Sequence, residues 1–380
     1  MTQNQQTTIF IASGGTGGHI IPARVLAQNL VTVKESRVLL IADKNYRNYH
    51  KQTDNFSHKI ICCGKFNGGA WKIAIAIINI IIGCIENFCY FIKYRPNVVV
   101  GFGGYATLPT LIIATIFRVK IILYEQNAYL GKVNRLFACV ADQILLSFSP
   151  TLAVKTKYIN KTKLLGNIVR EEFVKTAKEI SNEINAKEIK DEEISNRGNK
   201  KTFTLMITGG SGGAKIFSDL LPRIIINNFK ADQIKIIQQV KIGEVEKIKQ
   251  QYQEANIEAE VESFFDNIIN QYLEADLIIA RAGSSTIFEL TTLGKATILI
   301  PFRYAVDNHQ QLNAEILAKS GATIVFSEEE IANVSFSENL KKIIDNNFML
   351  KKIAKQSLLF NKDYSLARII EQIFKSINKT

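Results

Sequence analysis

The sequence predicts an α/β protein of two similar domains, each built on a parallel sheet. A glycine-rich loop between a strand-like and a helix-like segment occurs once in each half, at residues 13–19 and 208–214. Strand-like and helix-like segments also alternate through both halves, as a parallel sheet with crossover helices requires. The length of 380 residues fits two domains.

Each glycine loop has the sequence of an anion site. Residues 9–12 form an apolar, strand-like run before the first loop, and apolar residues recur at helical spacing through 20–30 after it. Residues 205–207 and 216–224 frame the second loop in the same way. A strand, a glycine turn and a helix together point backbone N–H groups and a helix N-terminus at an anion, usually a phosphate.

Neither loop matches the better-known nucleotide motifs. A Walker A loop ends in Gly-Lys-Ser/Thr, whereas Lys215 is followed by Ile216. The first loop does not read Gly-x-Gly-x-x-Gly, although Asp43 follows the strand-like run 38–42, where a ribose-binding carboxylate would stand. A dinucleotide enzyme is therefore disfavoured but remains an alternative.

The chain is basic, with a formal net charge of +12 and a pI of about 9.3. This charge favours an acidic partner, namely nucleic acid, anionic lipid or a phosphorylated substrate, although it can also serve only to solvate the protein. Nucleic acid is disfavoured because Lys and Arg are dispersed and no RNA-binding aromatic motif accompanies them. Scattered His and Cys residues and a polar N-terminus lead us to expect a cytoplasmic protein with no metal site and no cofactor.

Residues 70–94 form an unusually apolar segment rich in isoleucine. Lys72 and Glu86 are among the residues that interrupt it, so we expect it to be too short and too interrupted to cross a membrane. Two interpretations remain: a helix buried against the sheet, or a helix with one face on the sheet and another in a membrane. In the second case its flanking basic residues would meet anionic headgroups, namely Lys65, Lys72, Lys93 and Arg95.

Two further strands of the first half end in loops suited to a ligand. Residues 97–100 lead into a glycine-rich loop at 101–105, and residues 120–124 lead into Glu125-Gln126-Asn127. Ligands of open α/β sheets bind beyond the carboxyl ends of the strands, so we expect these loops to share one edge with the first glycine loop. The other strands that we expect are 38–42, 59–62, 143–146, 163–165, 234–237, 259–261, 276–280 and 296–300.

We expect residues 1–168 to form the first domain and residues 169–350 the second. A helical tail, 351–380, is expected to pack back toward the first domain. Residues 178–201 are highly polar and charged, which predicts a helix followed by an exposed loop.

Hydroxyl side chains stand at the start of a predicted helix in the second half. The strand 276–280 is followed by Ser284, Ser285 and Thr286, which would present hydroxyl and N–H groups to a diphosphate. Ser211 in the second glycine loop offers the same groups.

Three further side chains have both a structural and a functional interpretation. Glu289 follows Thr286 by three residues, which is equally typical of a capping box and of a carboxylate that accepts two ribose hydroxyls. Gln310 follows Asp307 at the same spacing. His19 in the first glycine loop is either structural or a general base.

Six motifs, taken in order along nearly the whole chain, resemble the MurG family. These are the bacterial N-acetylglucosaminyltransferases of glycosyltransferase family 28 that act in peptidoglycan synthesis. The motifs are Gly14-Gly15-Thr16-Gly17-Gly18-His19 with Pro22-Ala23, Gly101-Phe102-Gly103-Gly104-Tyr105, Glu125-Gln126-Asn127-Ala128 with Gly131 and Asn134-Arg135, Gly209-Gly210-Ser211 with Gly213-Ala214, Arg281-Ala282-Gly283 through Glu289, and Asp307 with His309-Gln310 and Asn313-Ala314.

The resemblance implies a GT-B fold, with two Rossmann-like domains separated by a deep cleft. The second domain would bind UDP-GlcNAc, and the first would bind the acceptor lipid I, which is undecaprenyl-diphosphoryl-MurNAc-pentapeptide. The implied reaction is inverting transfer of GlcNAc to the 4-hydroxyl of MurNAc, which gives lipid II. The resemblance also implies a peripheral enzyme on the cytoplasmic face of the inner membrane, with an anionic membrane surface and a cell-wall synthesis complex as partners.

The resemblance assigns roles to individual positions, and it favours the ribose role for Glu289 over the capping role. The positions it assigns to UDP-GlcNAc are Thr16, Gly17, Gly18, Asn127, Arg170, Ser211, Phe265, Ser284, Ser285, Thr286, Glu289 and Gln310. The positions it assigns to the acceptor's diphosphate are Gly14, Gly15, Gly103, Gly104 and Tyr105.

A base must take the acceptor's proton, and we expect it to be His19, with Glu125 as the second choice. No Asp-x-Asp pair suited to a metal is present, so N–H groups would stabilise the leaving diphosphate. The sequence departs from the family at Ile168, where the family has proline, and this departure bears on the placement of Arg170. Two other classes remain: a UDP-GlcNAc 2-epimerase, which shares the architecture but has a soluble substrate, and a nucleotide-binding module without chemistry.

Overall fold

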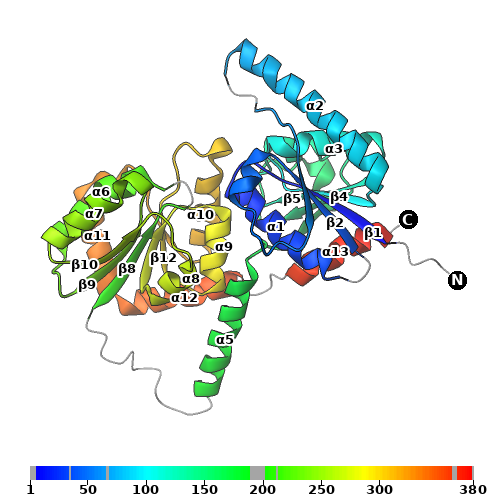
Figure 1. Ribbon diagram of the computed structural model, residues 1–380. Helices are drawn as coiled ribbons and strands as arrows, with labels where there is room; N and C mark the ends of the chain where they lie inside the picture. The colour runs from blue at the N-terminus through cyan, green and yellow to red at the C-terminus, as the bar shows by residue number, and fades with distance from the viewer. Residues whose placement is uncertain are drawn as a thin grey trace. The chain divides into compact units, whose positions relative to one another are not determined.

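The computed structural model describes residues 6–33, 36–65, 68–188, 202–210, 213–361 and 366–378. The chain divides into two compact units, the first comprising Met1–Arg170 with Asp363–Thr380 and the second Glu171–Lys362 (Figure 1). The C-terminal tail is shared between them, because helix α12 (Asn347–Phe360) belongs to the second unit and α13 (Leu366–Asn378) to the first.

The first unit is built on a seven-stranded sheet in the order β3-β2-β1-β4-β5-β6-β7. All of its neighbouring strands are parallel, and each strand overlaps a run that the sequence predicts, although β3 shares only two residues with the predicted run 59–62. The strands are β1 (Thr7–Ala12), β2 (Ser36–Ala42), β3 (Ser57–Ile60), β4 (Val98–Gly101), β5 (Lys120–Glu125), β6 (Gln143–Leu146) and β7 (Thr162–Leu164).

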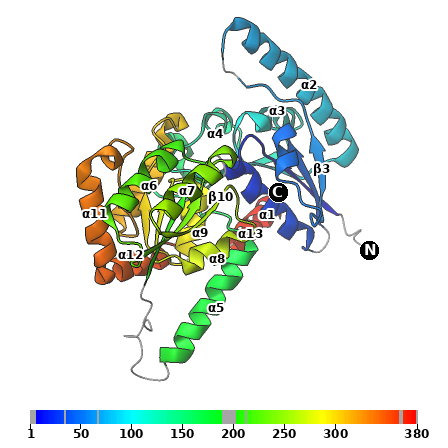
Figure 2. The same cartoon turned by 60° about the vertical axis from the view of Figure 1, so that its left-hand side comes forward.

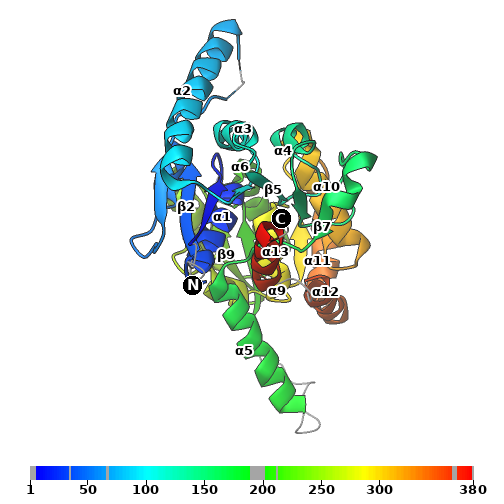
Figure 3. The same cartoon turned by 90° about the vertical axis from the view of Figure 1, so that its right-hand side faces the viewer.

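Alternate strand residues feed two cores on opposite faces of this sheet. Ile9 and Ile11 of β1 pack on one face with α1 (Gly17–Val31) and α13, whereas Phe10 packs on the other. Figure 3 shows α1 and α13 on their side of the sheet. The second face is covered by α2 (Ala70–Tyr94), α3 (Leu108–Ile116) and α4 (Lys132–Phe137), of which the sequence did not predict α3 and α4.

Helix α2 is mostly exposed, and its N-terminal part extends beyond the rest of the first unit (Figure 1). Only Ala76, Gly83, Asn87 and Phe91 are buried along its length. The interpretation as a core helix is therefore wrong. The expectation that the segment is too short and too interrupted to cross a membrane is also wrong. The helix has 25 residues, and its most apolar window has a mean hydropathy of 2.0, which by length and composition is enough to cross a membrane.

The second unit repeats the architecture with six parallel strands in the order β10-β9-β8-β11-β12-β13. Its strands are β8 (Phe203–Thr208), β9 (Ile234–Gln239), β10 (Glu258–Glu262), β11 (Leu277–Ala280), β12 (Thr297–Leu299) and β13 (Ile324–Val325), the last of which was not predicted. One face packs against α6 (Lys215–Asn228), α7 (Val245–Glu254), α11 (Val334–Asp345) and α12, and Figure 2 shows these helices.

The remaining helices of this unit are α5 (Glu171–Glu188), α8 (Ile268–Glu274), α9 (Ser284–Thr292) and α10 (His309–Lys319). Helix α5 begins the polar segment for which a helix and then a loop were predicted. The rest of that segment, residues 189–201, lies outside the described residues.

Candidate active site

Three loops of the first unit meet at the carboxyl edge of its sheet, because β1, β4 and β5 are neighbours. A Cβ on Gly104 would lie 3.8 Å from the carbonyl oxygen of Gly14 and 3.8 Å from Cδ2 of His19. A Cβ on Gly103 would lie 3.2 Å from Nδ2 of Asn134, which lies on α4 after the loop that follows β5. Gly103 and Gly104 have φ angles of 76° and 77°, which side-chain-bearing residues rarely adopt, and this conformation explains the two glycines.

The first glycine loop leaves the start of α1 open to a ligand. Gly14 could carry no side chain, because a Cβ there would lie 2.4 Å from Cβ of Ala106. Thr16 is the N-cap residue, and no described side chain caps the helix. The first-turn N–H groups of Gly17 and Gly18 are thus among those that an α-helix leaves without a backbone partner, as an anion site requires.

His19 is held by the loops that follow β4 and β5, in an orientation that suits a base. Its Nδ1 lies 2.7 Å from the carbonyl oxygen of Phe102 and 3.1 Å from Oε1 of Gln126. Both neighbours are acceptors, so Nδ1 carries the proton and Nε2 keeps its lone pair. Burial lowers the pKa of His19 below 6.5, which keeps the ring neutral at pH 7. The sequence did not indicate Gln126 as the residue that orients His19.

Glu125, the second candidate base, is a buried carboxylate that organises its own loop. One oxygen accepts hydrogen bonds from the backbone N–H of Gly131 at 2.8 Å and from Asn134 at 2.9 Å, and the other accepts from the N–H of Asn127 at 3.1 Å. Its side chain is buried, and burial raises the pKa of Glu125 despite these donors. The geometry therefore gives Glu125 a structural task and favours His19 as the base.

Asp43 also serves the first glycine loop and is not a free ribose ligand. One carboxylate oxygen accepts from the N–H groups of Gly15 and Asn45, each at 3.2 Å. The other accepts from the hydroxyl of Tyr105 at 2.5 Å and from Nδ2 of Asn45 at 3.1 Å. The dinucleotide alternative loses its candidate carboxylate, because protein donors already occupy both oxygens.

The turn before Arg170 tolerates the departure from the family pattern. Ile168 is buried in the core of the first unit, and its N–H donates to Oδ1 of Asn167 at 2.9 Å, a bond that proline could not make. The Tyr124 hydroxyl donates to the carbonyl of Gly166 at 2.8 Å and so holds the same turn. Arg170, half-buried, ends the first unit directly after this turn.

In the second unit, the second glycine loop follows β8, as predicted. Gly210 has a φ of 74°, and its N–H donates to the hydroxyl of Thr208 at 3.3 Å. The N–H of Gly213 donates to the carbonyl of Gly210 at 2.9 Å. Ser211 lies outside the described residues.

Helix α9 begins at Ser284, with Gly283 as its N-cap residue and no side-chain cap. Thr286 is therefore inside the helix, and the interpretation of Thr286 with Glu289 as a capping box is wrong. The hydroxyl of Ser285 is buried and has no hydrogen-bond partner among the described residues. Glu289 is buried on the same helix.

Two other predicted donor residues follow the carboxyl ends of β10 and β12 in the same sheet. Phe265 is buried in the loop after β10. Gln310 lies in the first turn of α10, and its Oε1 accepts from the backbone N–H of Phe302 at 2.9 Å. Gln310 therefore braces the loop after β12, and the capping box with Asp307 is wrong here too.

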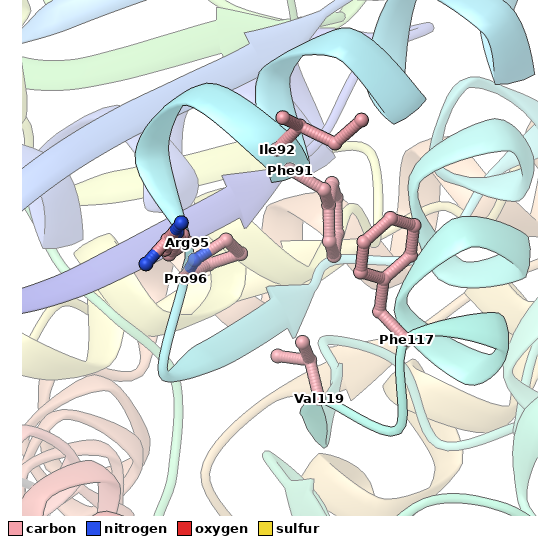
Figure 4. Close-up of a pocket in the computed structure, with 6 residues that line it drawn as sticks. All are labelled: Phe91, Ile92, Arg95, Pro96, Phe117 and Val119. Atoms are coloured by element: carbon pink, nitrogen blue, oxygen red, sulfur yellow. The ribbon is translucent and has the colours of Figure 1, made fainter.

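No group of three His, Cys, Asp or Glu side chains that could hold a metal occurs in the described parts of the chain. A hollow of about 420 Å³ lies away from the glycine loops, at the ends of α2 and α3 and the starts of β4 and β5 (Figure 4). It is lined by Phe91, Ile92, Arg95, Pro96, Phe117 and Val119, and it is not part of the candidate site.

Comparison with known proteins agrees with this geometry. Residues 9–146 match the glycosyltransferase family 28 N-terminal domain, and residues 204–373 match the C-terminal domain of the same family. The chain belongs to glycosyltransferase family 28.

One similar member of the family is the UDP-N-acetylglucosamine–N-acetylmuramyl-(pentapeptide) pyrophosphoryl-undecaprenol N-acetylglucosamine transferase of Rickettsia rickettsii. The two sequences are 33% identical over an alignment of 390 positions, which covers 96% of this chain and 99% of that protein. The similarity therefore extends through both units and is not confined to one nucleotide-binding domain.

Solved structures share the fold. MurG of Acinetobacter baumannii superposes with a TM-score of 0.76 at 24% identity, covering 97% of this chain and 99% of that one. A UDP-N-acetylglucosamine 2-epimerase superposes with a TM-score of 0.63 at 13% identity, covering 99% of this chain and 98% of that one. The predicted GT-B class, with two Rossmann-like parallel-sheet domains, is confirmed, but the fold alone does not separate transferase from epimerase.

Proposed function

We propose that this protein transfers GlcNAc from UDP-GlcNAc to the 4-hydroxyl of MurNAc in lipid I and so makes lipid II for peptidoglycan. The observation that carries the proposal is the similarity to the Rickettsia transferase along 96% of the chain. The anion-binding loops at the carboxyl edges of both sheets support it, because donor and acceptor each contain a diphosphate.

In this proposal the second unit binds the donor. Glu289 accepts the ribose hydroxyls of the uridine, and Ser284, Ser285 and Thr286 at the start of α9 face its diphosphate. The buried hydroxyl of Ser285, which has no hydrogen-bond partner in the described parts of the chain, supports this assignment, because a bound oxygen would complete its hydrogen bonding. The remaining donor positions are Thr16, Gly17, Gly18, Asn127, Arg170, Ser211, Phe265 and Gln310.

The first unit binds the acceptor and supplies the base. Nε2 of His19 takes the proton of the MurNAc 4-hydroxyl while its oxygen forms a bond to C1 of GlcNAc and the bond from C1 to UDP breaks. Attack opposite the leaving group inverts the configuration at C1. Preorganised N–H groups stabilise the charge that develops on the departing UDP. Gly14, Gly15, Gly103, Gly104 and Tyr105 form the surroundings of the acceptor's diphosphate.

Release of UDP from UDP-GlcNAc, measured with and without a lipid I analogue and in the presence of EDTA, tests this function. We expect release only with the analogue and no effect of EDTA. Release of UDP without an acceptor would indicate a hydrolase, and conversion of UDP-GlcNAc without net release of UDP would indicate an epimerase. Loss of release in EDTA would indicate a metal-dependent transferase. Binding of UDP without turnover would indicate a binding module.

We further propose that α2 holds the protein on the cytoplasmic face of the inner membrane, where the polyprenyl chain of the acceptor lies. Large apolar side chains are exposed along most of the helix, among them Trp71 (78% exposed) and Ile85 (60%). Basic residues at its two ends, including Lys72 and Lys93, would meet anionic headgroups.

Replacing Ile75, Ile78 and Ile82 together by Asn is expected to weaken binding to anionic vesicles at least about tenfold, because each isoleucine contributes apolar area to insertion. Cosedimentation with vesicles measures this. A matched triple replacement of exposed apolar residues in the second unit, Ile242, Val334 and Phe348, should leave binding unchanged. Equal binding by both triple variants would mean that α2 does not contact lipid.

A further inference from the structure

Lys65 lies over an aromatic ring at the first glycine loop. Its Nζ is 5.0 Å from the centre of the Tyr105 ring, which is a cation–π distance. Cε1 of Tyr105 lies 3.6 Å from the position that a Cβ on Gly15 would take. Lys65, Tyr105 and Gly15 are therefore neighbours in the first unit, although they are far apart in the sequence.

The buried carboxylate of Asp43 fixes both the ring and the loop. It accepts the Tyr105 hydroxyl at 2.5 Å and the Gly15 N–H at 3.2 Å. Burial and the neighbouring carboxylate raise the pKa of Tyr105, so the phenol keeps its proton and remains a donor to Asp43. Asn45 completes the cluster by donating to the Gly15 carbonyl at 3.0 Å. The ring under Lys65 thus has a defined place relative to the glycine loop.

Lys65 differs from Asp43 in that its charge is exposed to solvent. No ion pair to its ammonium group occurs within the described ranges, and the side chain is exposed. The carboxylate of Asp43, by contrast, is buried and accepts four hydrogen bonds, two from Asn45 and one each from Gly15 and Tyr105. Lys65 therefore adds an exposed positive charge beside the N–H groups of the loop, whereas the negative charge of Asp43 is buried, and a phosphate is the chemical group that matches the exposed cation and the N–H groups.

We propose that Lys65 binds the diphosphate of the lipid-linked acceptor, and that Tyr105 and Asp43 are positioning residues for it. Tyr105 acts through the ring beneath the ammonium group, and Asp43 acts by fixing Tyr105 and Gly15. This inference rests on the proposed function, since it takes lipid I as the acceptor. It gives Tyr105 a role through its ring and not through its hydroxyl, which Asp43 already engages.

The phosphate that Lys65 meets could belong to the acceptor or to membrane lipid, and a soluble acceptor separates the two sources. The assay uses a lipid I analogue with a short prenyl chain, in the absence of vesicles. In Lys65→Met we expect KM for the analogue to rise at least about tenfold, because a charge-assisted phosphate contact is lost. Turnover and KM for UDP-GlcNAc should stay within about twofold, and Lys65→Arg should restore most of the loss because it keeps the charge.

Lys157→Met is the matched control, because Lys157 also lies 5.0 Å from a tyrosine ring, that of Tyr158, but away from the glycine loops. It should behave as the wild type. Tyr105→Leu should raise the same KM, and combining it with Lys65→Met should add little, because the ring acts through the lysine. Asp43→Asn should also raise KM for the analogue and leave KM for UDP-GlcNAc unchanged, with thermal melting used to check its folding.

Three results would overturn the proposal. An unchanged KM for the soluble analogue in Lys65→Met would remove Lys65 from the acceptor site, and an effect seen only on vesicle binding would assign it to lipid headgroups. Fully additive effects of Lys65→Met and Tyr105→Leu would show that the ring does not position the lysine. Failure of the wild type to use the analogue at all would instead count against the proposed function.

Discussion

Replacing His19 by alanine is expected to lower kcat by about 10²- to 10⁴-fold, the usual contribution of a general base. The KM for UDP-GlcNAc should change by no more than about twofold, because the ring is proposed to meet the acceptor's hydroxyl and not the donor. The structural reason is the orientation of the ring, whose Nδ1 lies 2.7 Å from the Phe102 carbonyl and leaves Nε2 as the acceptor.

The pH profile gives an independent check on the same residue. A base works in its neutral form, and burial lowers the pKa of His19 below 6.5. The wild-type kcat/KM should therefore be level at pH 7 and above, and it should fall only as the pH drops below 6.5 through that lowered pKa. In His19→Ala this acid limb should be lost together with the activity.

Glu125→Gln separates the two candidate bases. Glu125 accepts from Gly131, Asn127 and Asn134, so its replacement should reduce activity by disturbing the loop but should leave the acid limb in place. Loss of the limb in Glu125→Gln, with a normal limb in His19→Ala, would reverse our assignment of the base.

Replacing Glu289 by alanine is expected to raise the KM for UDP-GlcNAc by about 10- to 100-fold, because hydrogen bonds to the ribose would be lost from a buried site. Glu289 is buried on α9, one turn beyond Ser285, and no capping box accounts for it, because the helix begins at Ser284. Steady-state kinetics at saturating acceptor measure the change.

A donor analogue whose uridine ribose lacks the 2′-hydroxyl makes this test specific. The wild type should discriminate against the analogue, whereas Glu289→Ala should use both donors with similar kcat/KM. If the variant still discriminates as the wild type does, the carboxylate is not the ribose ligand. Thermal melting of the variant shows whether the loss of a buried side chain has also lowered stability.

The sequence predicted the sheets well, because strand identity is local information. A run such as 97–100 is apolar and β-branched enough to be recognised without knowledge of its neighbours, and β4 (Val98–Gly101) is there. The short helices α3 and α4 were not predicted, because they follow glycine-rich and polar loops and have little periodic pattern of apolar residues. Strand β13 was not predicted, because it has only two residues.

The candidate site was predicted in part, and the misses share one cause. The glycines and His19 are recognisable because a strand, a turn and a helix are continuous in the sequence. The tasks of Asp43 and Tyr105 are not recognisable, because their hydrogen bond joins residues 62 positions apart. The capping boxes failed for a related reason, since the spacing of Thr286 and Glu289 indicates a cap only if the helix begins at Thr286, and it begins at Ser284.

The sequence by itself determined that this protein has two parallel-sheet domains with a glycine-rich loop in each, because these features depend on short, contiguous patterns of apolar residues and glycine. Only the tertiary structure decided which polar side chains are already occupied. It placed protein donors around Asp43 and Glu125, whereas no donor to Nε2 of His19 occurs among the residues that the structure describes. It also decided that α2 is exposed, since burial depends on whether another element packs over a helix, and hydropathy alone does not specify that.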